Sequence, residues 1–189
     1  MGQKVKDIQS YLIQRCKQGD SNAQRELYKL YAKNMYNTAF RILGHSAEAE
    51  DVLQDAFLEV FLRIQEYRED ASFGVWLKRI VINKSISQLR KRKLDLVDTG
   101  EFVDELKEEA EDFELDLNEA LIDLIRRGIN ALSDGYRLVI SLYLLEGYDH
   151  VEIAEILKIS ESTSKTQYLR AKSKLKEWLI QQKINIPYE

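Results

Sequence analysis

Proline is almost missing from this chain of 189 residues: the single one is Pro187, two residues before the end. Proline interrupts helices, so its absence leaves long segments free to be helical. Apolar residues recur at three- and four-residue spacings over most of the sequence, which is the pattern of helices that bury one face. Hydrophobic residues make up 44% of the chain, enough for real cores. We therefore predict an all-α fold.

The segment 147–176 predicts two short helices joined by a tight turn. Asp149 and Glu152 have the spacing of a capping box at the start of the first helix. Residues 153–157 give that helix an apolar face. Ser160 is an N-cap candidate for the second helix. This arrangement is typical of a helix-turn-helix.

The second helix of this pair combines an apolar face with a basic one. Between residues 158 and 176 there are six basic residues and one acidic residue. The second helix of a helix-turn-helix enters the DNA major groove, where side-chain donors reach base edges and phosphates. The alternative is a small helical hairpin with a solvated face. The predicted DNA-binding residues are Lys165, Thr166, Gln167, Arg170, Lys172 and Lys174.

A helix predicted for residues 47–65 carries two apolar stripes. One stripe contains Val52 and Ala56, and the other contains Leu53 and Phe57. Two stripes exceed what a half-buried helix requires, so the helix is either central to its domain or has one stripe reserved for a partner. A polar strip beside Leu58 is formed by Asp51, Gln54 and Asp55 and suits a basic helical partner.

Residues 73–93 predict one helix with a strongly basic end. Seven basic residues and no acidic residue lie between positions 78 and 93. A match to the helix dipole would explain part of this charge. The four successive cations 90–93 exceed that need, so we favour a phosphate-contacting surface. Arg79 and Asn83 lie one turn apart on the same face.

Charge is distributed unevenly along the chain. Residues 95–119 hold twelve acidic residues and one basic residue, a net charge of −11. Since the whole chain carries −4, the remainder carries +7. We predict two small helical domains, 1–93 and 118–189, joined by an acidic linker at 94–117.

Several motifs together resemble the extracytoplasmic-function (ECF) sigma factors of the bacterial sigma-70 family, which are promoter-specificity subunits of RNA polymerase. AEDVLQDAF at 49–57 is similar to the AEDxxQxxF helix of that family. FGVWLKRIVIN at 73–83 is similar to its FxxWLxxIxxN segment. The segments 152–157, 163–165 and 170–175 resemble its −35-reading domain.

The resemblance implies a role for each group of residues. Asp51, Gln54, Asp55 and Leu58 would bind core RNA polymerase at the clamp helices of its largest subunit. The helix-turn-helix would read the −35 element of promoter DNA. The resemblance further implies an initiation factor rather than an enzyme, without a cofactor or metal, and an anti-sigma factor as a further partner. The predicted −10 DNA-binding residues are Tyr67, Arg79, Asn83, Arg90, Lys91 and Arg92; for Tyr67 an ordinary loop aromatic is the alternative.

Four positions depart from the family's pattern. Lys158 replaces the usual glycine of the turn, and Ser164 replaces the valine that usually follows Thr163. Ser87 stands where an aspartate is common, and Ser133 replaces a proline. Because none of these changes removes a charged DNA contact, we expect the DNA-binding surfaces to be retained.

Other classes of protein fit the sequence less well. Cys16 is the one cysteine, which excludes a disulfide framework and suits a reducing compartment. The N-terminus has no apolar run of signal-peptide length, so we expect a cytoplasmic protein without membrane contact. His45 and His150 are far apart, and no metal-ligand spacing or glycine-rich phosphate loop is present. A regulator that binds DNA alone and a helical adaptor remain alternatives.

The acidic linker generates the first testable prediction. Its charge would screen the basic domains in the free protein and occupy a cationic channel of the polymerase in the complex. Each exposed contact contributes about 0–1 kcal/mol, and several act together. Changing four or five linker carboxylates to Asn or Gln should raise DNA binding by the free protein and lower initiation by the polymerase complex. The gain should shrink in about 1 M salt, where the Debye length is about 3 Å. Unchanged DNA affinity and unchanged abortive-transcript yield would make the segment a simple tether.

Overall fold

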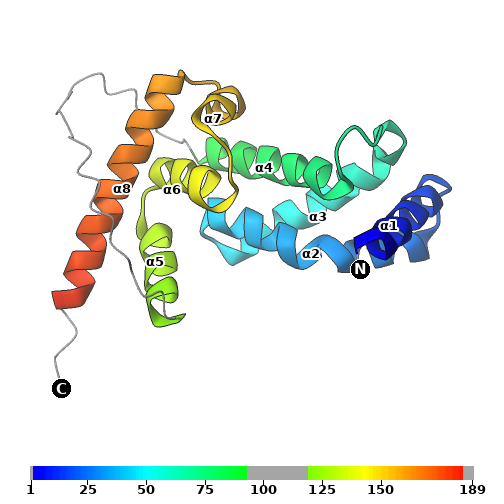
Figure 1. Ribbon diagram of the computed structural model, residues 1–189, viewed down its shortest axis with the longest axis horizontal. Coiled ribbons are helices and arrows are strands. Elements are labelled where there is room, and N and C mark those ends of the chain that lie inside the picture. Colours follow the sequence, from blue (N-terminus) through cyan, green and yellow to red (C-terminus); the bar gives the residue numbers. More distant parts are fainter. Residues whose placement is uncertain (1, 93–118, 185–189) are drawn as a thin grey trace. The chain divides into compact units, whose positions relative to one another are not determined.

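The computed structural model describes residues 2–92 and 119–184. Every regular element in those two ranges is helical, which confirms the predicted all-α class (Figure 1). Contacts divide the chain into two compact units, with the boundary between Lys93 and Leu94. The predicted acidic linker at 94–117 lies outside the described residues, so its role stays a prediction.

The second helix of the first unit begins and ends at capping residues. The side chain of Asp20 accepts hydrogen bonds from the backbone N–H groups of Asn22 at 2.8 Å and Ala23 at 3.3 Å, which caps the second helix. Gly44 ends that helix with a φ of 71°, a conformation that favours glycine. The elements are α1 (Gly2–Lys17), α2 (Ser21–Leu43), α3 (Ser46–Leu62), the 3₁₀ turn η1 (Ile64–Glu66) and α4 (Phe73–Lys91).

The core of the first unit is formed where α2, α3 and α4 pack against one another, while α1 packs against α2. Both apolar stripes of α3 are buried in this core: Leu53 and Phe57 are 6% and 3% exposed, and Val52 and Ala56 are 5% and 0% exposed. Of the two alternatives for this segment, the central helix is therefore correct, and neither stripe is held free for a partner. The largest fully buried side chains here are Leu27, Ile42, Leu43, Leu77, Ile82 and Leu89.

The second unit is organised around one long helix. Figure 1 shows α8 running past α5 and α6, and α8 also packs against α7. The elements are α5 (Glu119–Ala131), α6 (Asp134–Ile140), the π-helical turn η2 (Ser141–Leu145), α7 (His150–Leu157) and α8 (Glu161–Ile184).

The α7–α8 connection is a helix-turn-helix with satisfied backbone groups. The predicted capping box is confirmed: the Asp149 N–H donates to Glu152 Oε2 at 2.9 Å, and the Glu152 N–H donates to Asp149 Oδ1 at 2.8 Å. Lys158 has a φ of 60°, the left-handed conformation that explains the usual glycine at this position of the family. Ser160 Oγ accepts from the Thr163 N–H at 3.0 Å and caps α8.

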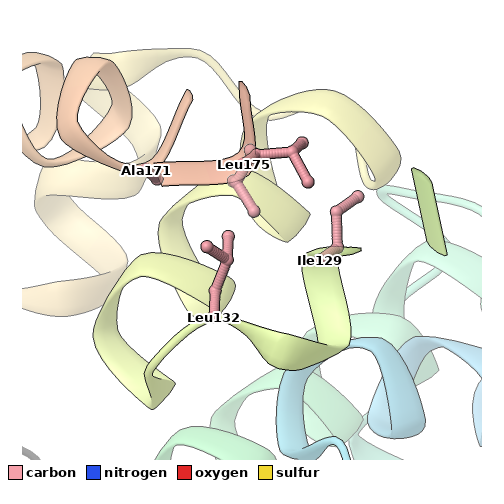
Figure 2. Close-up of a cluster of buried hydrophobic side chains, with 5 residues drawn as sticks. Ile129, Leu132, Ala171 and Leu175 are labelled. Atoms are coloured by element: carbon pink, nitrogen blue, oxygen red, sulfur yellow. The ribbon is translucent and has the colours of Figure 1, made fainter. Parts of the chain in front are cut away.

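A close contact between α5 and α8 closes the core of the second unit. Figure 2 shows Ile129 of α5, and Leu132 just after its end, facing Ala171 and Leu175 of α8. One turn of α5 approaches α8 through Gly128. A Cβ atom at Gly128 would lie 2.5 Å from Leu175 Cδ1 and 2.9 Å from Trp178 Cε3. The absence of a side chain at this position therefore allows the two helices to approach.

This contact predicts the effect of Gly128→Ala. Alanine is the better helix former by about 0.5–1 kcal/mol, but the overlap with Leu175 should cost about 1–3 kcal/mol. We expect a lower free energy of unfolding of the second unit in urea. In a Leu175→Ala background the nearest contacting atom is gone and only the Trp178 ring remains close, so the loss caused by Gly128→Ala should be smaller there. A stabilised Gly128→Ala protein would contradict the close contact.

Candidate nucleic-acid interface

An exposed strip follows the outer face of α3. Asp51, Gln54, Asp55 and Leu58 are all exposed, and their spacing of three and four residues places them on one side of the helix. Leu58 is 61% exposed, and Leu62, one turn further, is 75% exposed. The sequence analysis missed Leu62, although its spacing from Leu58 was visible. The strip thus presents two carboxylates, an amide and two leucines that the core does not use.

A groove of about 360 Å³ lies between α3 and α4. Asp55 of α3 and Arg63, just after its end, line it on one side, and Asn83, Ser87 and Lys91 line it from α4. The fold therefore brings one residue of the predicted polymerase site and two of the predicted −10 site to the same groove.

Glu59 spans this groove. Its Oε2 lies 3.0 Å from Lys84 Nζ, and its Oε1 accepts a hydrogen bond from Arg63 Nη1 at 2.8 Å. The hydrogen bond with Lys84 is the main reason why the pKa of Glu59 lies below its usual value. Lys84 is half-buried. Its charge is therefore already partly balanced by the facing helix.

Arg79 and Arg90 are exposed on the outer face of α4, and Asn83 is exposed where this face meets the α3–α4 groove. A rotation of about 100° per residue places these three on one side of the helix. The Ser87 hydroxyl donates to the backbone carbonyl oxygen of Asn83 at 2.8 Å. This bond does not involve the side-chain amide of Asn83. Lys91 is also exposed, on the groove side. Four of the predicted −10 residues thus lie on an accessible surface.

Arg92 does not have the exposed position that the sequence analysis predicted. It is half-buried and forms an ion pair with Glu48 at the start of α3. Its Nη1 donates to the Leu43 carbonyl oxygen at 3.3 Å. Arg92 therefore joins the end of α4 to the α2–α3 corner, because the guanidinium satisfies a carboxylate and a helix-terminal carbonyl together.

Tyr67 also differs from its predicted role in −10 binding. It is 7% exposed, and its hydroxyl donates to the Ala71 carbonyl oxygen at 2.8 Å. Its ring packs against Phe73 and Trp76, with centroid distances of 5.5 and 5.3 Å. Lys17 Nζ donates to the Tyr67 carbonyl oxygen at 3.1 Å. Of the two alternatives for Tyr67, the structure therefore favours a packed loop aromatic over a pocket for a flipped base.

On α8 the structure separates the predicted residues by face. Lys165, Thr166 and Lys172 are exposed, and the rotation of about 100° per residue brings Lys172 back close to Lys165. Lys165 Nζ lies 2.7 Å from Glu161 Oε1, which raises the pKa of Lys165. Leu169 lies between them on the same face and is half-buried. The sequence analysis missed Leu169, whose apolar side chain is of the type that contacts thymine methyl groups.

The other three predicted residues of α8 lie elsewhere on the helix. Gln167 is 8% exposed and belongs to the packed side, so the prediction of an exposed donor there was wrong. Arg170 is half-buried at the edge of that side. Lys174 is exposed but lies about 180° around the helix from Lys165, and its Nζ is 2.9 Å from Glu177 Oε2.

Other kinds of site were sought in residues 2–92 and 119–184. Within these ranges, no group of three or more His, Cys, Asp or Glu side chains is arranged to hold a metal ion. None of the helices described there is both long enough and apolar enough to span a membrane.

Two family models match the chain. Sigma-70 region 2 matches residues 27–94, and Sigma-70 region 4 matches residues 122–175. The first match contains the α3 strip and the outer face of α4, and the second contains the helix-turn-helix.

Curated relatives and solved structures agree with these matches. The chain is 31% identical to the ECF RNA polymerase sigma factor SigW of Bacillus subtilis over 88% of this chain and 94% of the relative. It is 28% identical to the ECF RNA polymerase sigma-E factor of Escherichia coli over 85% and 88%. The sigma factor RpoE of Bartonella quintana, solved with the anti-sigma factor NepR, has a TM-score of 0.53 at 25% identity and covers 82% of this chain and 95% of its own. CnrH, solved with the cytosolic domain of CnrY, has a TM-score of 0.52 at 22% identity, covers 91% and 97%, and supports the fold.

Proposed function

The chain belongs to the ECF sigma factors of the sigma-70 family. From this premise, we propose which of its surfaces binds each partner during transcription initiation. The α3 strip binds core RNA polymerase, the outer face of α4 acts on the −10 element, and the exposed face of α8 reads the −35 element. The observation that carries this proposal is the capped helix-turn-helix, whose second helix presents Lys165, Thr166 and Lys172 on one exposed face.

Reading of the −35 element requires donors that enter the major groove from the N-terminal half of a recognition helix. Lys165 and Thr166 lie in the second turn of α8, and Lys172 lies on the same face further along. Lysine donors pair with guanine acceptors, and the threonine hydroxyl pairs with either type of base. Lys165 forms an ion pair with Glu161 in the free protein. When the protein binds DNA, Lys165 exchanges this ion pair for a contact with the DNA.

Opening of the −10 element requires a cationic surface beside groups that hold unpaired bases. Arg79 and Arg90 supply exposed charge on α4, and Asn83 supplies an amide between them. The amide can pair with the Watson–Crick edge of a base once the strands separate. Lys91 extends the cationic surface into the α3–α4 groove.

Core polymerase is bound by the α3 strip. Asp51 and Asp55 provide negative charge. Leu58 and Leu62 provide apolar surface that is exposed to solvent and could be buried by a partner. A helical partner with basic and apolar residues matches this strip, and the resemblance to the family implies that this partner is the clamp helices of the largest polymerase subunit. Because core polymerase is cytoplasmic, the protein acts in the cytoplasm.

The same surfaces are available to a regulator. RpoE of Bartonella quintana was solved in complex with the anti-sigma factor NepR. For this chain we propose an anti-sigma factor that covers the polymerase- or DNA-binding surfaces. The chain itself acts as an initiation factor and not as an enzyme.

Two lysines of α8 give a matched test of −35 reading. Lys172→Gln removes a charge from the exposed face, whereas Lys174→Gln removes the same charge from the opposite side. We expect Lys172→Gln to weaken promoter binding by the polymerase complex and to reduce the salt slope, −d log K/d log [salt], by about one, while Lys174→Gln leaves both unchanged. Filter binding between 50 and 200 mM salt measures both quantities. Equal losses for the two variants would show that this face of α8 does not meet DNA.

Charge reversal on α3 tests polymerase binding. Asp51→Lys with Asp55→Lys should reduce the affinity for core polymerase, because two favourable contacts become repulsive. The double reversal Glu26→Lys with Asp123→Lys makes the same change in net charge at exposed positions outside α3 and serves as the control. Fluorescence anisotropy with labelled protein measures the affinity, and circular dichroism checks that both variants are folded. Co-elution of the α3 variant with core polymerase at wild-type affinity would rule out this strip.

A further inference from the structure

A polar contact links the two helices of the helix-turn-helix. His150 is the first residue of α7, and Ser164 lies in the first turn of α8. The His150 Nδ1 and Ser164 Oγ atoms are 2.9 Å apart, which is hydrogen-bond distance. Ser164 is fully buried, with 0% exposure, so its hydroxyl depends on partners inside the protein.

Aromatic rings fix the imidazole in place. The ring of His150 stacks on Tyr143 with a centroid distance of 4.5 Å and an interplanar angle of 16°. It also meets Tyr168 edge-on at 5.6 Å, and the two tyrosine rings are 4.5 Å apart. The cluster of His150, Ser164, Tyr143 and Tyr168 therefore ties together η2, α7 and α8.

Ser164 immediately precedes the exposed residues Lys165 and Thr166. Any change in how α8 meets α7 at Ser164 would move these two side chains relative to the rest of the unit. The valine that is usual at this position in the family has no hydrogen-bonding group. The polar link is therefore a feature of this chain's own residues.

We propose that His150 is a positioning residue for −35 recognition: its neutral imidazole, bonded to Ser164 and stacked on Tyr143, holds the start of α8 in its DNA-reading orientation. The proposal rests on the proposed function of α8. It implies that −35 discrimination weakens as the pH falls and His150 takes up a proton.

The charges around His150 favour its neutral form. Burial is the main reason why the pKa of His150 lies below its usual value, and Lys165 of α8 lowers it further. Asp149 of α7 and Glu161 of α8 act in the opposite direction without overcoming these two effects. Burial raises the pKa of Tyr168, so its phenol group brings no charge to this cluster near neutral pH.

The direction of the pH effect follows from these shifts. Because the folded protein has the lower pKa, the unfolded chain binds more protons near pH 6. The contribution of His150 is therefore fully present above the ordinary histidine pKa of about 6.5 and is lost as the pH falls through the folded value. Protonation places a hydrogen on Nδ1, which can then only donate to Ser164 Oγ, so a hydrogen bond donated by the serine hydroxyl must reverse, and the new positive charge lies in the field of Lys165.

The test uses promoter DNA with a randomised −35 element, bound by the complex of core polymerase and the full chain at pH 8 and pH 6. His150→Asn keeps an amide group near the position of Nδ1 but does not titrate. His45→Asn is the matched control, since His45 is the other histidine and is exposed in the first unit. The discrimination ratio between selected and random −35 sequences is the readout, and circular dichroism checks folding.

We expect the wild-type ratio to fall by about twofold to fourfold from pH 8 to pH 6, because an ordinary histidine pKa of about 6.5 limits the linkage effect at pH 6 to about fourfold, and the His45→Asn protein to behave in the same way. His150→Asn should discriminate at pH 8 and show a flat pH profile. His150→Phe keeps the ring but leaves Ser164 without this partner, so it should lose about fivefold in discrimination at pH 8. Adding Ser164→Val should restore that loss.

The outcomes separate the inference from the function on which it rests. Wild-type selection of −35 sequences with an unaltered pH profile in His150→Asn would overturn the positioning role and leave the function of α8 standing. A wild-type complex that selects no −35 sequence at pH 8 would overturn both.

Discussion

The packing of α8 against α5, α6 and α7 is the constraint on which the proposed DNA-reading surface depends. Gly128 allows α5 to approach, and Ala171 and Leu175 fill the space between the helices. Once this side of α8 is buried, the rotation of the helix decides which polar residues remain outside. Lys165 and Lys172 stay in solvent, whereas Gln167 is buried only two residues after Lys165. Burial and sequence recognition are therefore consequences of one packing arrangement.

In the first unit, α3 likewise combines a buried side with an exposed one. This helix is the centre of its core, because both apolar stripes are covered, and it still presents a strip of acidic and apolar residues on its outer side. Glu59 lies between that strip and α4, where it balances Lys84. The surfaces proposed for polymerase binding and for the −10 element are thus adjacent in one set of packed helices, and their separation is fixed by the α3–α4 contact.

Much of the fold could be predicted from local sequence. The capping box at Asp149, the Asp20 cap and the long helix over 73–91 depend on residues a few positions apart, which a linear pattern reveals. The errors came from contacts between distant positions. Arg92 meets Glu48, 44 residues away, and the ring of Tyr67 meets Phe73 and Trp76 across a loop with a left-handed Glu69. Gln167 was predicted to be exposed because it is polar. The spacing of apolar residues shows which face of α8 is buried, but it does not show that contacts with three other helices extend this buried face as far as Gln167. Charge counts cannot distinguish a cation that meets DNA from one that joins two helices.

The most direct test of the account is transcription from a promoter library in which the −35 element, the −10 element and the spacer are randomised, with core RNA polymerase and the full chain. The account predicts transcripts that begin at a fixed distance from two enriched elements, and only when both proteins are present. Sequences enriched by the chain alone, with no transcript start added by core polymerase, would contradict it and would describe a regulator that binds DNA by itself.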